Sequence, residues 1–272
     1  ELQSDGKILT VSNVWTDSRK FVLMRHNTDG TLDTSYGVDG ISYFSPLGNT
    51  GVYQAFDAKM LDNDYVLVLG YYYNNFGRPI LMRFDPNGNI DTSFGDNGWV
   101  VYNDGHSVVM EDMAIQSDGK ILLAGYRADD DLNDEFCIMR FTADGQLDTT
   151  FGPNGMFLHA MYNSFGFKSG SYLQSISVAP NGKIYAGGFR TKDDPYWGSV
   201  QACILLCLDE TGAFDTTFGE DGVLQFKVGE VLDYLIDFAI LPDGKIVACG
   251  HSETYVEQGG PNYSIFVTRL NA

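Results

Sequence analysis

The chain has 272 residues, of which 44% are hydrophobic and 19% are charged. This balance provides material for a sizeable core and excludes an intrinsically disordered chain. Thirty-six acidic residues against seventeen basic ones give a net charge of −19, which argues against nucleic acid and anionic membranes as partners because both repel such a surface. The longest apolar stretch, residues 65–73, is too short to span a bilayer, so no membrane insertion is expected.

Two short motifs recur along the chain and define a repeat of roughly sixty residues. The first reads apolar-Asp-Thr-Ser/Thr-aromatic-Gly and occurs at residues 32–37, 90–95, 147–152 and 214–219. The second, Asp/Asn-Gly-Lys-Ile, occurs at residues 5–8, 118–121, 181–184 and 243–246, with a degenerate copy, Asn-Asp-Tyr-Val, at residues 63–66. Five copies of the second motif predict five repeats in one domain of residues 1–272, with boundaries near 1–52, 53–108, 109–170, 171–232 and 233–272.

Each repeat contains four short predicted strands, which we term a to d in chain order. Residues 1–3 hold only the end of strand a of repeat one. In repeat three the strands are predicted at residues 112–116, 120–126, 136–141 and 156–161. Asp-Gly turns join a to b and c to d, because Gly tolerates a positive φ. The fifth repeat stops after strand c, residues 263–270, which leaves open that flanking strands are missing.

The fold class follows from this strand pattern. Strand b is apolar along most of its length, which is typical of a strand buried on both faces. No segment has a 3.6-residue apolar period long enough for a helix. Four strands per repeat predict an all-β β-propeller of five four-stranded blades. The competing interpretation is a linear β-solenoid, but solenoid coils are usually much shorter than these repeats.

The repeated segments resemble a known family. Asp-Gly-Lys-Ile-Leu, Met-Arg-Phe and Asp-Gly-x-Leu-Asp-Thr-Ser/Thr-Phe-Gly are similar to the delta-60 repeat of bacterial secreted and surface proteins, over essentially the whole chain. The resemblance implies a β-propeller and an extracytoplasmic location (secreted, periplasmic or cell surface), and it implies no defined activity. The chain departs from the pattern at Asn63 and Asp64, which replace Asp-Gly, and at Cys207, which replaces Arg.

The four cysteines are Cys137, Cys203, Cys207 and Cys249. Cys203 and Cys207 lie four residues apart in a predicted strand, about 13 Å apart, which is too far for a disulfide. No metal-ligand spacing of Cys or His occurs. We therefore expect all four to be reduced and to pack as small buried hydrophobic side chains.

An arginine stands eight positions before the first-motif Asp in repeats one to three. The intervening Asx-rich turn is similar to a calcium loop, but a guanidinium at the first ligand position would repel a divalent cation. An internal Arg–Asp clamp is therefore favoured over calcium sites, and neither a metal nor a cofactor is expected. The aromatic residue of each motif is interpreted as a plug between blades. The clamp comprises Arg25 with Asp33, Arg83 with Asp91, and Arg140 with Asp148.

Strand a carries a second recurrence, six residues before the Asp or Asn of each a–b turn. The residues there are Asp57, Asp112, Ser175 and Asp237. Because strand a is innermost in a propeller, these acids are candidates for a polar-ligand ring or for catalytic carboxylates at the channel mouth. The alternative is that each accepts backbone hydrogen bonds that lock blade to blade, and repetition favours this alternative because chemistry rarely needs the same group in every blade.

Ligand binding is predicted on the loops that differ between repeats. The a–b and c–d turns share one face and are repeated, whereas the b–c and d–a loops share the other face and diverge, as binding loops do. Exposed aromatic residues beside acids and amides there suit a carbohydrate; the alternative is that they cover the blade ends. The acidic run 129–135 is interpreted as a solvated loop. The candidate binding residues are Tyr71, Tyr72, Tyr73, Phe76, Tyr196 and Trp197, together with Asp57, Asp112 and Asp237.

Two functions remain in view. The first is a non-catalytic binding or scaffold propeller, expected to be a monomer, with a glycan or protein ligand. The second is a propeller glycoside hydrolase, which needs one acid of raised pKa and a second carboxylate about 5–10 Å away. Asp57, Asp112 and Asp237 are equivalent copies, and Glu111 is the one acid beside them that differs between repeats. The four histidines are scattered and no G-x-S-x-G motif occurs, so the binding function is favoured.

Overall fold

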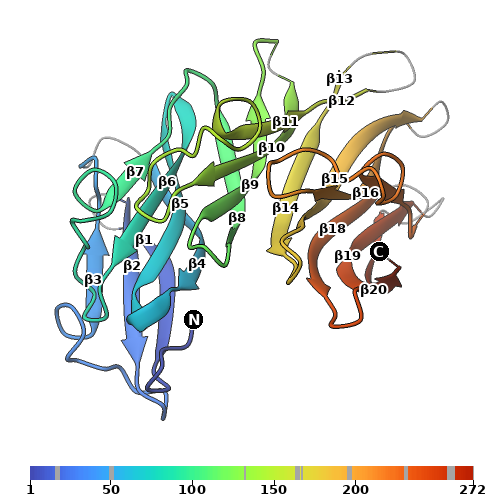
Figure 1. Ribbon diagram of the computed structural model, residues 1–272. Helices are drawn as coiled ribbons and strands as arrows, with labels where there is room; N and C mark the ends of the chain where they lie inside the picture. Colours follow the sequence, from blue (N-terminus) through green and yellow to red (C-terminus); the bar gives the residue numbers. More distant parts are fainter. Residues whose placement is uncertain are drawn as a thin grey trace. The chain divides into compact units, whose positions relative to one another are not determined.

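The computed structural model describes residues 1–15, 19–48, 52–131, 133–162, 166, 168–194, 198–229, 232–255 and 261–271. These residues form β-strands, turns and two short 3-10 segments, η1 (Asp62–Asp64) and η2 (Pro153–Gly155). The all-β class predicted from the sequence is confirmed. The chain divides into two compact units, one of Glu1–Ile121 with Phe141–Gln146 and one of Leu122–Arg140 with Leu147–Ala272 (Figure 1). The number of blades and the repeat boundaries stay predictions.

The first unit begins with two antiparallel meanders. Strands b, c and d of repeat one form the sheet β1-β2-β3, with bounds Ile8–Trp15, Arg19–His26 and Ile41–Phe44. The four strands of repeat two form the sheet β4-β5-β6-β7, with bounds Val52–Met60, Val66–Asn74, Phe76–Phe84 and Trp99–Val101. In each sheet consecutive strands pair antiparallel, which is the topology expected within a blade.

Repeat three contributes the sheet of order β11-β10-β9-β8. Its strands are β8 (Val108–Ile115), β9 (Ile121–Ala128), β10 (Asp134–Phe141) and β11 (Met156–His159). All four were predicted, but strand a begins at Val108 rather than at residue 112. The early residues Val108, Val109 and Met110 are buried, so the hydrophobic run alone indicated the longer strand.

The second unit contains the remaining strands. A short pair, β12 (Met161–Tyr162) and β13 (Lys168–Ser169), precedes the repeat-four meander β14 (Ser171–Val178), β15 (Ile184–Asp194), β16 (Gly198–Leu208) and β17 (Val223–Phe226). Repeat five follows with β18 (Leu232–Ile240), β19 (Ile246–Tyr255) and β20 (Pro261–Leu270). One parallel bridge, between Gln201 and Leu232, connects β16 to β18.

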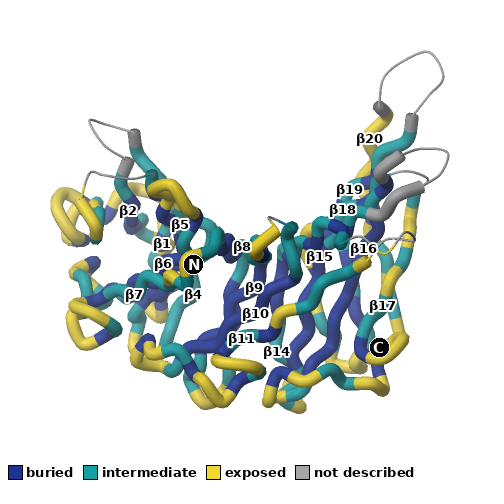
Figure 2. Tube along the Cα trace, turned by 90° about the horizontal axis from the view of Figure 1, so that it is seen from above, coloured by how far each residue is buried: buried dark blue, intermediate teal, exposed yellow. Residues whose placement is uncertain are grey.

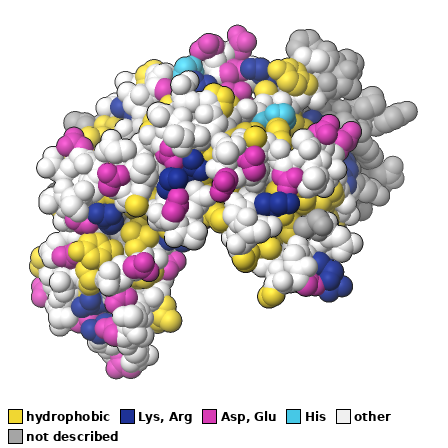
Figure 3. Space-filling model, viewed as in Figure 1, with side chains coloured by type: hydrophobic (Ala, Val, Ile, Leu, Met, Phe, Trp, Pro, Cys, Tyr) yellow, Lys and Arg dark blue, Asp and Glu magenta, His cyan; other side chains and the backbone are white. Residues whose placement is uncertain are grey.

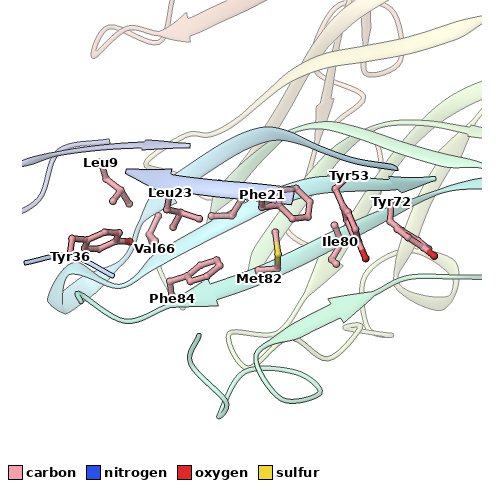
Figure 4. Close-up of a cluster of buried hydrophobic side chains, with 11 residues drawn as sticks. Leu9, Phe21, Leu23, Tyr36, Tyr53, Val66, Tyr72, Ile80, Met82 and Phe84 are labelled. Carbon is pink, nitrogen blue, oxygen red and sulfur yellow. The ribbon is translucent and has the colours of Figure 1, made fainter. Parts of the chain in front are cut away.

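The core of the first unit lies between the sheets of repeats one and two. Leu9 and Phe21 from β1 and β2 meet Tyr53, Tyr72 and other buried side chains of β4, β5 and β6 (Figure 4). Buried residues concentrate along the middle strands, whereas exposed residues gather in the turns (Figure 2). Each fully buried large side chain contributes roughly 1.5–3 kcal/mol, so the stacking of neighbouring sheets stabilises both.

A β-bulge interrupts strand a at the same place in three repeats. The pairing register shifts between Ala55 and Asp57, between Leu173 and Ser175, and between Leu235 and Asp237. A glycine on strand b lies opposite each bulge: Gly70, Gly188 and Gly250. A Cβ at Gly188 would lie 2.0 Å from the carbonyl oxygen of Tyr172. The strands can therefore approach closely only because this position is glycine.

We expect Gly188→Ala to destabilise the protein by about 1–3 kcal/mol, because the added methyl group forces the two strands apart. The free energy of unfolding, measured by urea denaturation, tests this. Ser177→Ala, on β14 of the same sheet, is the control and should unfold close to the wild type. Equal midpoints for Gly188→Ala and wild type would show that the strands can separate at no cost.

Candidate functional site

The first-motif Asp and the arginine eight residues before it are in contact in repeats one, two and three. The arginine Nε donates to the Asp Oδ2, over 2.7 Å between Arg25 and Asp33, 2.7 Å between Arg83 and Asp91, and 2.8 Å between Arg140 and Asp148. The Oδ1 of each Asp accepts from the N–H and the hydroxyl of the Ser or Thr two residues later: Ser35, Ser93 and Thr150. This explains why the motif reads Asp-Thr-Ser/Thr.

The same arginines also bind the next repeat. Nη1 of Arg25 donates to the carbonyl oxygen of Pro86 over 2.8 Å, and Nη1 of Arg83 donates to that of Ala143 over 3.0 Å. Arg140 donates to the carbonyl oxygen of Glu210 in the same way. We call each set of Arg, Asp and neighbouring carbonyl a latch. It joins two neighbouring repeats through charge-assisted hydrogen bonds.

The aromatic residue of the motif completes the latch as a plug. Tyr36, Phe94, Phe151 and Phe218 are buried. The guanidinium of Arg140 lies over the ring of Phe151, 4.7 Å from its centroid, and a Cβ at Gly212 of the next repeat would lie 2.9 Å from that ring. The glycine in the next turn therefore makes room for the plug.

Repeat four lacks the arginine and uses a lysine instead. Lys183, from the a–b turn, forms an ion pair with Asp215, while the thiol of Cys207 lies 3.8 Å from the same carboxylate. Burial raises the pKa of Cys207 to about 11, so the thiol is neutral. In the first unit, Lys7 likewise lies 3.0 Å from Asp33. In each unit the a–b turn and the first motif are thus at the same end of the sheet, as predicted.

The cysteines pack in the interior, and no disulfide joins them. Cys137, Cys203 and Cys207 are buried, whereas Cys249 is half-buried, which corrects the prediction that all four are fully buried. Burial raises the pKa of Cys203 to about 12. Among the described residues, no group of three His, Cys, Asp or Glu side chains could hold a metal ion. Within the same part of the chain, no helix has the length and apolarity needed to cross a bilayer.

The latch should contribute different amounts to the free energy of unfolding in different repeats. The Arg140 and Asp148 side chains are 6% and 7% exposed, against 18% and 14% for Arg83 and Asp91. Removing one partner of a buried pair costs about 3–5 kcal/mol, and water screens the more exposed pair. We expect Arg140→Ala to lower the free energy of unfolding more than Arg83→Ala does, measured by chemical denaturation. The reverse order would contradict the burial argument.

The strand-a acids accept hydrogen bonds from backbone amides, and Asp57 and Asp237 directly follow the extra residue of a bulge. The Oδ1 of Asp57, Asp112 and Asp237 accepts from the N–H of the following residue over 2.8 Å in each case. The Oδ2 of Asp57 also accepts from the N–H of Met113 over 3.3 Å, in the next repeat. In repeat four the equivalent Ser175 donates its hydroxyl to Asp237 over 2.8 Å. The bonds of Asp57 with Met113 and of Ser175 with Asp237 connect neighbouring repeats.

A lysine compensates two of these acids. Lys59 Nζ lies 2.8 Å from Asp57 and 3.5 Å from Asp112. Burial acts to lower the pKa of Lys59, but both carboxylates outweigh it and raise that pKa. The sequence analysis did not select Lys59. It stands two residues after Asp57, on the same face of β4 by alternation, and this spacing was the available signal.

The predicted aromatic residues of β5 and β6 separate into two groups. Tyr72 is 3% exposed and packs in the core (Figure 4), so the expectation that its side chain is exposed is wrong. Phe76 is 46% exposed but pairs with Asn74, which places it on the opposite face from Tyr71 and Tyr73. These two tyrosines have stacked rings with centroids 6.3 Å apart, and Tyr73 is 47% exposed.

Phe56 extends this pair of tyrosines. Its ring centroid lies 6.0 Å from that of Tyr71. Phe56 is the extra residue in the bulge next to Asp57, and it lines an open pocket of about 340 Å³ with Leu9, Asp57 and neighbouring residues. We define Phe56, Tyr71 and Tyr73 as the aromatic platform. Phe56 was not among the predicted site residues, because only the bulge turns its side chain towards the tyrosines.

Other predicted site residues lie elsewhere. Tyr196 and Trp197 lie outside the described residues. Asp129, predicted to be in a solvated loop, is 9% exposed and forms an ion pair with Lys168. That lysine and the N–H of Asn133 lower the pKa of Asp129 to about 2. Elsewhere, acidic side chains are scattered among Lys and Arg over the face shown in Figure 3.

Comparisons with known proteins give a family and distant structural likenesses. The model of a β-propeller domain of unknown function, DUF5122, matches residues 3–36, 65–94, 116–151 and 179–218. No curated protein matches the chain significantly. A crystal structure of an exo-1,5-alpha-L-arabinanase from a bovine ruminal metagenomic library has a TM-score of 0.40 and 10% identity, covering 97% of this chain and 99% of that one.

Proposed function

The chain belongs to the DUF5122 β-propeller family, and we propose that it is a non-catalytic binding or scaffold propeller whose ligand contacts the aromatic platform. The observation that carries the proposal is the contrast between two groups of residues. The repeated acids are bound to backbone amides, whereas the non-repeated tyrosines keep an exposed stacked surface.

The acids support binding rather than catalysis. A glycoside hydrolase needs one carboxylate as a proton donor and a second one free to act as nucleophile or base. Asp57 has its Oδ2 beside both Lys59 and the N–H of Met113, and Asp112 bonds the same N–H group through Oδ1. These oxygens hold the strands in register, and a substrate would have to displace structural bonds to reach them.

The aromatic platform supports a glycan or a protein as ligand. Aromatic rings stack on the C–H faces of sugars and also anchor protein interfaces. Tyr73 presents nearly half of its surface to solvent, and Phe56 lines the adjoining pocket. The similarity to delta-60 repeats supports an extracytoplasmic location, where such ligands occur, and we propose that location together with a monomeric state.

Truncating the platform should weaken binding without unfolding the protein. An interface aromatic contributes on the order of 1–2 kcal/mol, so Tyr73→Ala should weaken ligand binding about tenfold. A glycan array and a pull-down from cell-surface extract would identify ligands, and calorimetry would give the affinities. Tyr43→Ala, which removes an exposed tyrosine of β3, is the matched control. Equal affinities of Tyr73→Ala and Tyr43→Ala would refute the assignment.

One observation favours a hydrolase as the second candidate. Glu111 stands beside Asp112 on β8 and is half-buried, and its carboxyl group forms no hydrogen bond or ion pair among the described residues. Burial raises its pKa, so it keeps its proton at a pH where an ordinary Glu has lost it. Such a carboxyl group is a candidate general acid.

A hydrolase would lose activity when this acid is altered. Purified protein should be assayed against a panel of polysaccharides and aryl glycosides. The binding proposal expects no turnover by the wild type. Turnover that falls at least a hundredfold in Glu111→Gln, with the thermal midpoint kept, would favour the enzyme instead. Turnover that Glu111→Gln leaves unchanged would exclude Glu111 as the acid.

A further inference from the structure

The a–b turn of repeat two has a tyrosine where other repeats have a lysine. The N–H of Leu61 donates to the carbonyl oxygen of Tyr65 over 2.7 Å, as the N–H of Gln3 does to that of Lys7 over 2.9 Å. The same bond closes the turns before Lys120, Lys183 and Lys245. Tyr65 is therefore the structural equivalent of these lysines.

The replaced lysine has a defined partner in other repeats. Lys7 Nζ lies 3.0 Å from Asp33 Oδ2, the same oxygen that accepts from Arg25, and Lys183 binds the Oδ2 of Asp215. The carboxylate of the motif can thus hold an ammonium and a guanidinium together. In repeat two, Asp91 Oδ2 binds Arg83, and its own turn supplies no ammonium.

A pocket of about 560 Å³ lies beside this carboxylate, within the first unit. Tyr65, Arg83 and Asp91 line it on the side of repeat two, and Ile115 and Ala143 line it on the side of repeat three. It is thus separate from the aromatic platform. Asp91 keeps its negative charge there: burial acts to raise its pKa, but hydrogen bonds from Ser93 and Arg83 keep that pKa below the ordinary value.

We propose that this pocket binds a primary alkylammonium group, whose nitrogen takes the place beside Asp91 that a lysine nitrogen takes beside Asp33 and Asp215. Three features of the pocket fit that group. Asp91 and Asp62 supply negative charge to offset the guanidinium of Arg83, Ile115 and Ala143 offer apolar surface to the alkyl stem, and the pocket volume of about 560 Å³ leaves room for that stem. The Tyr65 ring already has the Arg83 guanidinium 6.0 Å from its centroid.

The backbone of the turn supports a specialised role. Asp64 takes the place of the turn glycine and has a φ of 61°, and its neighbour Asn63 has a φ of 59°. Residues other than glycine rarely adopt this conformation. Asp64 is held by hydrogen bonds to the N–H and hydroxyl of Ser4 in repeat one. Repeat two therefore closes the turn with the same bond between Leu61 and Tyr65 but along a different backbone path, and it has no lysine at the end of the turn.

The test compares charged and neutral probes of the same length. Titrating n-pentylammonium at low ionic strength should shift the backbone amide NMR signals of Ser93, Ser117 and Gly119 in a saturable way, whereas 1-pentanol should bind at least tenfold more weakly. Nα-acetyl-lysine N-methylamide tests the source. Tighter binding than n-pentylammonium would indicate a lysine side chain of a protein partner, and weaker binding would indicate a small free amine.

The variant Tyr65→Lys restores the ammonium of the other repeats within the chain and should reduce probe binding at least tenfold. Tyr43→Lys is the matched control, since it adds the same charge at an exposed site on β3, and it should bind like the wild type. Probe binding by Tyr65→Lys equal to that of Tyr43→Lys would overturn the proposal. So would equal binding of n-pentylammonium and 1-pentanol by the wild type, a result that does not depend on the folding of any variant. Both outcomes are independent of ligand binding at the aromatic platform.

Discussion

The contact between neighbouring repeats depends on the guanidinium group of the repeat arginine. Its Nε satisfies the carboxylate of its own repeat, and its Nη1 satisfies a carbonyl oxygen of the next one. Charge-assisted hydrogen bonds of this kind are stronger than neutral ones and fix direction as well as distance. The ring of Tyr36, Phe94 or Phe151 then packs under the guanidinium. One short motif therefore fixes both the shape of its own turn and the position of the next sheet.

Recurrence in the sequence predicted most of this framework. The Arg–Asp spacing of Arg83 and Asp91 recurs in several repeats, so the contact between the two side chains could be inferred without coordinates. The replacement of arginine by Cys207 likewise indicated a different arrangement in repeat four, although the sequence did not show that Lys183 takes over the carboxylate. The ion pair between Lys183 and Asp215 forms because the a–b turn and the first motif lie at the same end of the sheet.

The candidate site was predicted less well, because a side chain's exposure depends on its face of the strand and on register. Three consecutive tyrosines in β5 look equivalent in sequence, yet alternation buries Tyr72 and exposes Tyr73. Phe56 joins the platform only because a bulge turns it towards Tyr71. Asp129 was predicted to lie in a solvated acidic loop, but a lysine 39 residues later forms a hydrogen bond with its carboxylate. Such long-range partners are not encoded by local patterns.

The plug-and-glycine contact has a consequence for synthesis of the chain on the ribosome. Tyr36 packs against Gly88, which is translated 52 residues later. At ordinary elongation rates that interval lasts about 3–10 s. During this interval the ring and its arginine have been synthesised but the glycine turn that contacts the ring has not. A similar delay recurs at Phe94 and Phe151. Until the next repeat is synthesised, each of these three rings therefore lacks the glycine against which it packs.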